Sequence, residues 1–159
     1  MKHYFKYDSG YVNVNDENLF LTSSGNWQET HDLEEKSRAT IAQNERRINR
    51  MKGFVYVVFG GAGFGIYKIL NNKEASIGII VGLIAMAYYV LQYYKSDFGK
   101  RYKIPLGKIE GIERHERQGL KINFRNVNNE PDFEVIENVD PKGFKIVEEI
   151  KLITSMKQS

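Results

Sequence analysis

Two uncharged apolar stretches divide an otherwise polar chain, and they constrain its fold more than any other feature. No charged residue occurs from Gly53 to Tyr67 or from Ala75 to Tyr94. A bilayer core of ~30 Å is spanned by about 20 helical residues, and fewer suffice when flanking side chains reach the interface. The second stretch has this length, and the first attains it by continuing to Leu70 with the stem of Lys68 extended to the interface. We therefore predict transmembrane helices over 53–70 and 75–94.

A short polar turn, NNKE at 71–74, joins the two stretches and predicts a helical hairpin over 53–94. The alternative is a pair of helices buried in the core of a soluble protein. Soluble helices usually keep one polar face, and neither stretch has such a face. The transmembrane hairpin is therefore the favoured interpretation.

Cations flank the predicted hairpin on its outer sides, whereas the turn region holds only Lys68 and Lys73. The positive-inside rule therefore predicts that both termini are cytoplasmic. The cations nearest the predicted membrane surface, called the basic collar below, are Arg46, Arg47, Arg50, Lys52, Lys95, Lys100, Arg101 and Lys103. Each cation is worth ~1 kcal/mol near an anionic surface, so the collar either binds anionic headgroups or only sets the topology.

The glycine-rich run GGAGFG at 60–65 lacks the spacing of a phosphate-binding loop. A dinucleotide fingerprint would require glycine at position 66 or 68, where Ile66 and Lys68 stand, and no Gly-Lys-Ser/Thr follows for a P-loop. Glycines four residues apart instead give a flat helix face that permits close packing in lipid. The pairs that fit this pattern are Gly61 with Gly65 and Gly78 with Gly82. They are predicted to pack the two spans together, or to mediate dimerisation.

The polar flanks predict a small β-structure that the hairpin interrupts. Residues 1–26 contain the strand-like segments HYFKY, YVNVN and NLFLTSS, and residues 95–159 contain YKIPLG, KIEGIERHE, GLKINFRNV and DFEVIENV. Between the first strands and the hairpin, residues 27–52 lack glycine and proline and predict a polar juxtamembrane helix. Asp140 and Pro141 suit the start of a helix. The apolar face of this last helix consists of Phe144, Ile146, Val147, Ile150 and Ile153.

The segments IPLGKIEGIERHERQGLKINFRN and DFEVIENVDPKGFKIVEEI resemble the second half of bacterial pleckstrin-homology-like (PH/GRAM-like) domains, and GYVNVNDENLFLTSSG resembles their opening strands. The resemblance implies an α+β fold, a small antiparallel barrel or sandwich closed by a C-terminal capping helix. It also implies a bacterial inner-membrane protein with the transmembrane hairpin inserted between early and later strands. The paired Lys/Arg signature with which some members bind inositol phosphates is not recognisable in the first hairpin.

Catalysis finds little support in the sequence. There is no cysteine, and His3, His31 and His115 lack metal-ligand spacing, so we expect no enzyme activity, cofactor or metal. A net charge of +3 is too small to predict nucleic-acid binding. Two functions remain: a membrane-anchored PH-like module that binds a lipid headgroup, ligand or protein, or an accessory or immunity-type subunit of a larger inner-membrane complex. The expected partners are the bilayer and a membrane protein or a second copy.

Overall fold

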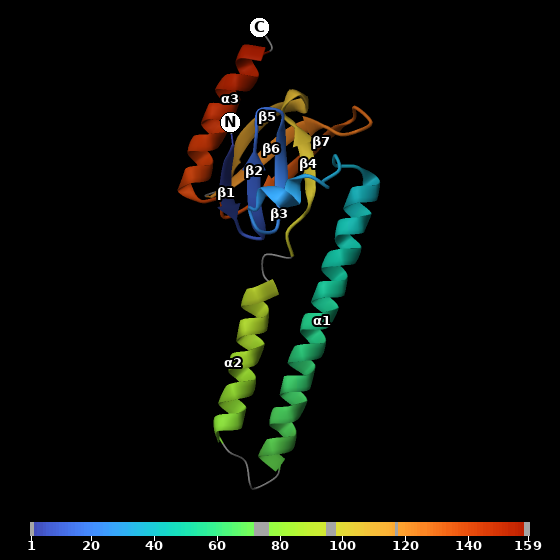
Figure 1. The fold of residues 1–159 in the computed structure, drawn as a ribbon, viewed down its shortest axis with the longest axis vertical. Helices are drawn as coiled ribbons and strands as arrows, with labels where there is room; N and C mark the ends of the chain where they lie inside the picture. Colours follow the sequence, from blue (N-terminus) through green and yellow to red (C-terminus); the bar gives the residue numbers. More distant parts are fainter. Residues whose placement is uncertain (1, 72–76, 95–97, 117, 158–159) are drawn as a thin grey trace.

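Two strands that are neighbours in one sheet are separated in the chain by a long helical insertion. The computed structural model describes residues 2–71, 77–94, 98–116 and 118–157, with side chains described as far as Lys151 (Figure 1). The elements in chain order are β1 (His3–Tyr7), β2 (Gly10–Val14), β3 (Asn18–Thr22), η1 (Trp27–Thr30), α1 (Arg38–Asn71), α2 (Ile77–Tyr94), β4 (Tyr102–Pro105), η3 (Leu106–Lys108), β5 (Ile109–His115), β6 (Gly119–Arg125), β7 (Pro131–Ile136) and α3 (Pro141–Lys157). This arrangement confirms the predicted α+β class.

The first sheet has the strand order β1-β2-β3-β4, with every neighbouring pair antiparallel. Its β2–β3 connection is an Asx turn, in which the Asn15 side-chain oxygen accepts hydrogen bonds from the backbone N–H groups of Glu17 (3.0 Å) and Asn18 (2.7 Å). The sequence between β3 and β4 contains both long helices, so these paired strands are brought together across the whole hairpin.

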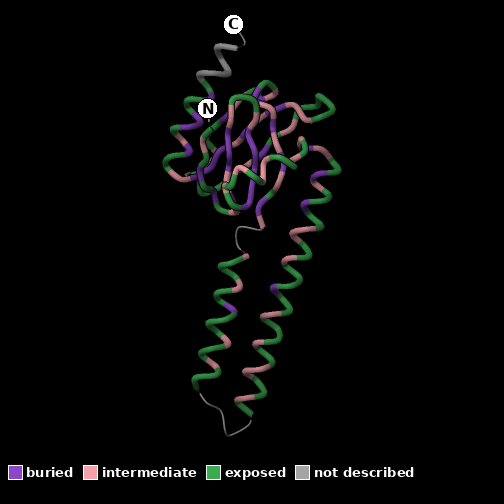
Figure 2. The backbone as a smooth tube through the Cα atoms, viewed as in Figure 1, coloured by how far each residue is buried: buried purple, intermediate pink, exposed green. Residues whose placement is uncertain are grey.

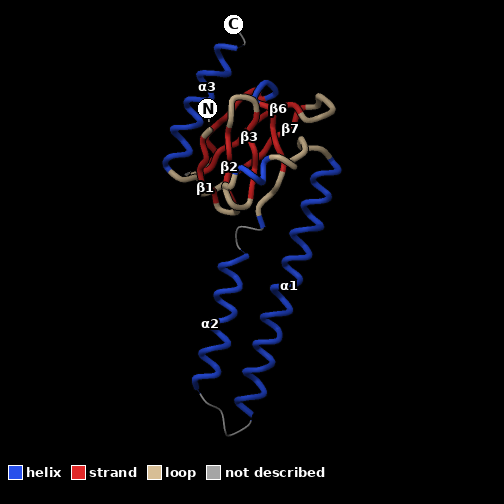
Figure 3. Tube along the Cα trace, viewed as in Figure 1, coloured by secondary structure: helices blue, strands red, loops and turns tan. Residues whose placement is uncertain are grey.

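The second sheet has the order β5-β6-β7 and is also antiparallel. Alternation along β6 buries Leu120, Ile122 and Phe124 on one face, as the period of two predicts. The β6–β7 turn is closed by Asn126, whose side-chain oxygen accepts from the backbone N–H groups of Asn128 and Glu130. The strands predicted from the sequence are thus confirmed in both sheets, which Figure 3 shows above the helical hairpin.

Helix α3 begins where the sequence predicts it. Pro141 occupies its first position, and the Asp140 carboxylate accepts a hydrogen bond from the Gly143 backbone N–H at 2.7 Å, which satisfies one of the free amides at the helix start. The Asp140 carboxylate also accepts from the Lys6 backbone N–H, and the Asp140 N–H donates to the Lys6 carbonyl. The start of α3 therefore covers the outer edge of β1.

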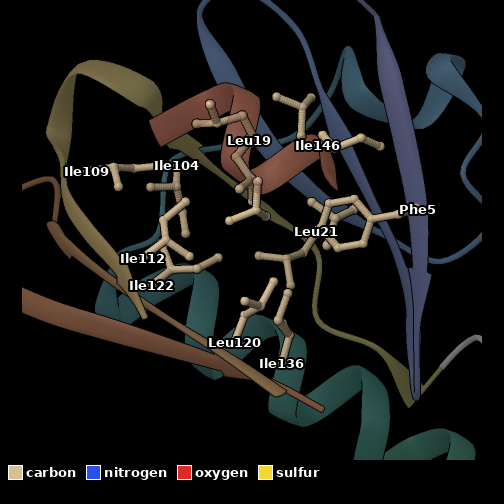
Figure 4. Packing of buried hydrophobic residues seen from close by; sticks show 14 of the residues in the cluster. Phe5, Leu19, Leu21, Ile104, Ile109, Ile112, Leu120, Ile122, Ile136 and Ile146 are labelled. Carbon is tan, nitrogen blue, oxygen red and sulfur yellow. The ribbon is translucent and has the colours of Figure 1, made fainter. Parts of the chain in front are cut away.

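One apolar core joins the two sheets and α3 (Figure 4). The first sheet contributes Phe5, Leu19, Leu21 and Ile104, and the second contributes Ile109, Ile112, Leu120, Ile122 and Ile136. Ile146, Val147 and Ile150 close the core from α3. The sheets and α3, at residues 2–37 and 98–157, are called the β-domain below.

Helices α1 and α2 extend away from the β-domain as a hairpin, and they contact each other (Figure 1). Both are long and apolar enough to cross a membrane by length and composition. Figure 2 shows exposed and partly exposed residues along nearly their whole length. Most large apolar side chains of the hairpin are uncovered, whereas core helices of soluble proteins are mostly buried.

The helix predicted over 27–52 begins only at Arg38. The preceding residues form the short turn η1 and then an extended segment, in which Glu35 forms a parallel bridge with Lys103 of β4. Ser37 stops this segment and starts the helix, because its hydroxyl accepts from the Thr40 N–H while the Thr40 hydroxyl accepts from the Ser37 N–H. Residues 72–76, including Lys73 and the first two positions of the predicted second span, lie outside the described residues.

Candidate functional site

The two ends of the helical hairpin meet at one buried carboxylate of the β-domain. Glu134 lies on β7, on the same strand face as the core residue Ile136, and its side chain is only 2% exposed. One carboxylate oxygen accepts from Lys36, just before α1, at 3.2 Å, and the other accepts from Lys100, after α2, at 2.7 Å. A single carboxylate therefore ties the entry and the exit of the hairpin to the second sheet.

The Lys36 ammonium is almost fully buried, with a side chain 7% exposed. It also donates to the Asp132 carboxylate at 3.1 Å and to the Phe133 carbonyl at 2.7 Å, so all three of its N–H donors have partners. The rings of Phe124 and Tyr102 lie 5.0 and 5.7 Å from the ammonium. The cluster pairs two lysines with two carboxylates, as buried charges require.

Two buried tyrosines adjoin this cluster. The Tyr102 hydroxyl donates a hydrogen bond to the Glu134 carboxylate. Burial raises the pKa of Tyr102 well above its ordinary value of 10.0, and the negative charge of Glu134 raises it further. Burial also raises the pKa of Tyr7, and the negative charge of Glu134 is the next largest cause. Both phenols are therefore neutral at physiological pH.

A second set of contacts fixes the first turns of α1 against the chain that follows α2. The Asn44 side chain donates to the Arg101 carbonyl at 2.9 Å and accepts from the Arg101 N–H at 2.8 Å, so it binds the backbone as a neighbouring strand would. One turn later, Arg47 donates to the Gly99 carbonyl. A side chain at Gly99 would collide with the Ser9 carbonyl oxygen, so this close approach requires glycine.

The extended segment before α1 provides the third attachment. The Lys103 N–H donates to the Glu34 carbonyl at 2.9 Å, and the Lys36 N–H donates to the Lys103 carbonyl at 3.2 Å. These bonds extend the first sheet beyond β4 and cover its open edge. They also place Lys36 beside β7.

The described residues of the basic collar differ in their surroundings, because some are exposed on α1 and others contact neighbouring parts of the protein. Arg46, Arg50 and Lys52 are exposed on α1. Arg47 and Lys100 make the contacts given above, Arg101 donates to the Ser23 hydroxyl at 2.7 Å, and the backbone of Lys103 pairs with the segment before α1. Lys95 lies outside the described residues. Arg47 therefore attaches α1 to the β-domain, and the other three contacts fix the chain that follows α2 within it.

The glycines predicted to pack the spans lie in different surroundings. A side chain at Gly65 would contact Leu83 of α2 at 3.4 Å, so this glycine faces the other span. A side chain at Gly61 or Gly82 would meet nothing within 4 Å, and Gly78 is also exposed. Within the described chain, the hairpin is therefore not packed through all four glycines, and Gly61 and Gly82 lie open on its surface.

Open hollows occur at the end of the β-domain nearest the hairpin. One of ≈ 610 Å³ is lined by His115, Glu116, Gln118, Gly119, Glu137 and Asn138. A smaller one of ≈ 230 Å³ lies between α1, the β1–β2 turn and the chain after α2. Among the described residues, no group of three or more His, Asp and Glu side chains could hold a metal ion.

Glu134 and Lys36 were not singled out from the sequence. A signal for Glu134 exists, because the period of two along β7 places it on the inner face with Ile136, where a charge needs a partner. No local signal identifies that partner, since Lys36 lies 98 positions away in the chain. The Ser37 cap could have been found, because serine commonly precedes a helix start.

No known family model matches the chain, and neither a curated protein nor a solved structure matches it significantly.

Replacing Glu134 with glutamine should destabilise the β-domain by roughly 3 kcal/mol or more, because it leaves the buried Lys36 charge poorly compensated. Urea unfolding of the full chain in detergent, followed by the fluorescence of Trp27, the only tryptophan, measures the effect. The matched control is Glu110→Gln, which removes an exposed ion pair with Arg125 and should cost at most about 1 kcal/mol. If both variants lose the same free energy of unfolding, Glu134 does not stabilise the buried Lys36 charge as proposed.

The free energy of unfolding should decrease as the pH rises above 10.0. In the unfolded chain the tyrosines ionise at their ordinary pKa of 10.0, whereas the raised pKa values of Tyr7 and Tyr102 keep these groups protonated in the folded chain. Each raised group makes the decrease steeper by up to ~1.4 kcal/mol per pH unit. Tyr102→Phe should therefore give a shallower decrease than the native chain when urea unfolding is measured over this pH range, and an equally steep decrease would contradict the role of Tyr102.

Proposed function

We propose that the protein is a non-enzymatic integral membrane protein that displays a PH-like binding module at the cytoplasmic surface of the bacterial inner membrane. The observation that carries this proposal is the contrast between the two parts of the chain. Most residues of the hairpin are exposed or partly exposed, including most of its large apolar ones, whereas the β-domain buries its large apolar residues in a single core (Figure 2). In water such a hairpin would expose a large apolar surface, and a bilayer removes that cost.

The distribution of charge supports the cytoplasmic orientation. Exposed Arg46, Arg50 and Lys52 precede the apolar part of α1, and Lys100 follows α2, whereas Lys68 lies near the other end of α1, so most of the described cations next to the hairpin lie on its β-domain side. Cations near the ends of transmembrane helices favour the cytoplasmic face. The module's ligand would be a lipid headgroup, a soluble ligand or a protein.

The order of elements supports the PH-like part of the proposal. Four antiparallel strands, three antiparallel strands and a terminal helix that completes the core agree with the arrangement that the sequence resemblance implies. The hairpin is inserted between β3 and β4, which lie side by side, so it interrupts the sheet without separating its strands.

Cysteine accessibility tests the membrane topology, because the native chain contains no cysteine. Asn71→Cys lies at the far end of α1, and Asn128→Cys lies on the exposed β6–β7 turn of the β-domain. In intact cells a membrane-impermeant thiol reagent should label position 71 and should reach position 128 only after permeabilisation. Labelling of both positions from the same side would refute the transmembrane hairpin.

A second candidate function, an accessory or immunity-type subunit of a larger inner-membrane complex, is favoured by the open glycines of the hairpin. Gly61 and Gly82 present helix surface on which no side chain of the described chain lies. Such surfaces allow another transmembrane helix to approach closely. The partner would be a different membrane protein or a second copy.

Two leucine substitutions distinguish a partner contact from packing within the hairpin. Gly61→Leu should abolish association with the partner and leave the hairpin's own stability unchanged, because its surroundings are open. Gly65→Leu should weaken the hairpin itself, because Leu83 lies against that position. Both are compared by purification from gently solubilised membranes and by thermal unfolding of the purified chain. If Gly61→Leu retains the same associated proteins and oligomeric state as the native chain, this candidate function is wrong at that surface.

A further inference from the structure

Several separate segments of the β-domain meet at its end nearest the hairpin. The β1–β2 turn at residues 8–9, residues 115–116 and 118 between β5 and β6, and the residues after β7 all lie at this end. The Asp8 N–H donates to the Glu137 carbonyl at 3.0 Å, and the Val139 N–H donates to the Gln118 carbonyl at 2.8 Å. We call this the hairpin-side end, defined by residues 8–9, 115–116, 118 and 137–138.

The depth of the hairpin-side end relative to the membrane follows from the part of α1 that lies beside it. Ile48 lines the ≈ 230 Å³ pocket together with Asp8, Ser9 and Phe98. The uncharged part of the same continuous helix begins at Gly53, so Ile48 lies about 8 Å beyond the edge of the apolar segment at 1.5 Å per residue. The headgroup region is roughly 5 to 8 Å thick on each side of a bilayer. The hairpin-side end therefore lies at headgroup depth when the hairpin spans the membrane.

The second helix gives the same depth independently. The ring of Tyr94, the last residue of α2, lies 5.5 Å from the ring of Phe54 at the start of the uncharged part of α1. The chain re-enters the β-domain at Phe98, only a few residues later, and Gly99 packs directly against Ser9. Little chain is thus available to lift the β-domain away from the bilayer.

Both signs of charge occur at this end. Exposed carboxylates of Glu116 and Glu137 line the ≈ 610 Å³ hollow, and Asp8 lies in the neighbouring pocket. Lys100 also lines that pocket with a side chain 53% exposed, and its contact with Glu134 uses one of its three donors. A zwitterionic phospholipid complements both signs, because its ammonium group pairs with these carboxylates and its phosphate pairs with Lys100 and with the exposed Arg50 and Lys52 of α1 at the same depth.

We propose that the hairpin-side end rests in the headgroup layer of the membrane that the hairpin crosses, in contact with zwitterionic phospholipid headgroups. The proposal rests on the transmembrane hairpin of the proposed function and specifies which surface of the β-domain the membrane covers. The opposite end, with the β2–β3 and β6–β7 turns, then faces water. The seven residues of β6 separate the two ends by about 20 Å at 3.3 Å per residue.

Two cysteine variants at opposite ends of β6 test this orientation in the full chain. Gln118→Cys and Asn128→Cys replace exposed amide side chains on the two turns that flank this strand. Each variant carries a small fluorophore and is reconstituted into phosphatidylethanolamine vesicles that contain a lipid with a nitroxide on its headgroup. The label at position 118 should be quenched several-fold more strongly than the label at position 128. Equal quenching at the two positions, whether strong or weak, overturns the proposed orientation.

A third label separates this proposal from the transmembrane hairpin itself. Ala85→Cys lies on exposed surface within α2 and should be quenched by lipids brominated on their acyl chains. If position 85 is quenched and positions 118 and 128 do not differ, the hairpin spans the bilayer and the orientation is wrong. If position 85 is not quenched, the proposed function itself fails.

The headgroup chemistry is tested by changing the lipid. In vesicles of an uncharged sugar-headgroup lipid the hairpin should hold the end at the same depth, but the thermal unfolding temperature of the full chain should be lower than in phosphatidylethanolamine vesicles, because charged headgroup partners for Glu137 and Lys100 are missing. An unchanged unfolding temperature would overturn the choice of zwitterionic lipid.

Discussion

The buried carboxylate of Glu134 is the interaction on which the relation between hairpin and β-domain depends. It binds Lys36 before α1 and Lys100 after α2, and it accepts from Tyr102 within the core. Isolated buried charges are unstable, so the buried Glu134 carboxylate and the nearly buried Lys36 ammonium each require a charged partner. Loss of Glu134 would remove one of the two carboxylate partners of Lys36 and also the partner of Lys100, so the attachment at the two ends of the hairpin is cooperative through this one group.

The contacts around α1 make that attachment stiff as well as cooperative. Asn44 and Arg47 lie one helical turn apart and bind consecutive parts of the chain that returns from α2. Because α1 is one uninterrupted helix, a section of it beside the β-domain and a section in the apolar hairpin move as one body. In the proposed membrane setting, the β-domain would thus be held at a fixed depth, whereas a flexible linker would allow it to diffuse away from the surface.

Periodicity predicted the parts of this structure that depend on local pattern. Alternation placed Leu120, Ile122 and Phe124 on the inner face of β6. Asp140 with Pro141 marked the start of α3. The helix start at Arg38 was missed, because helix-forming residues before it are held extended by backbone bonds to Lys103 of β4. Propensity is a weak prior that such tertiary pairing overrides. Sequence position likewise did not reveal which collar residues also contact the β-domain, such as Arg47 with the Gly99 carbonyl and Lys100 with Glu134.

The position of the insertion also constrains how the β-domain closes. The first sheet needs β4 beside β3, and all of α1 and α2 lie between them in the chain. The entropy of closing a flexible loop increases only slowly with its length, and packed helices lie about 8 to 10 Å apart. A hairpin that has already formed therefore holds Tyr94, at the end of α2, beside Phe54 of α1, so the chain after α2 starts next to α1 and not at the end of a long flexible loop. Formation of the hairpin thus removes part of the closure cost. The first turns of α1 extend beyond Tyr94 toward the β-domain, and the contacts of Asn44 and Arg47 bind them to the returning chain. The β-domain is in this sense completed by its insertion, because the same helices that separate β3 from β4 in sequence bring them together in space.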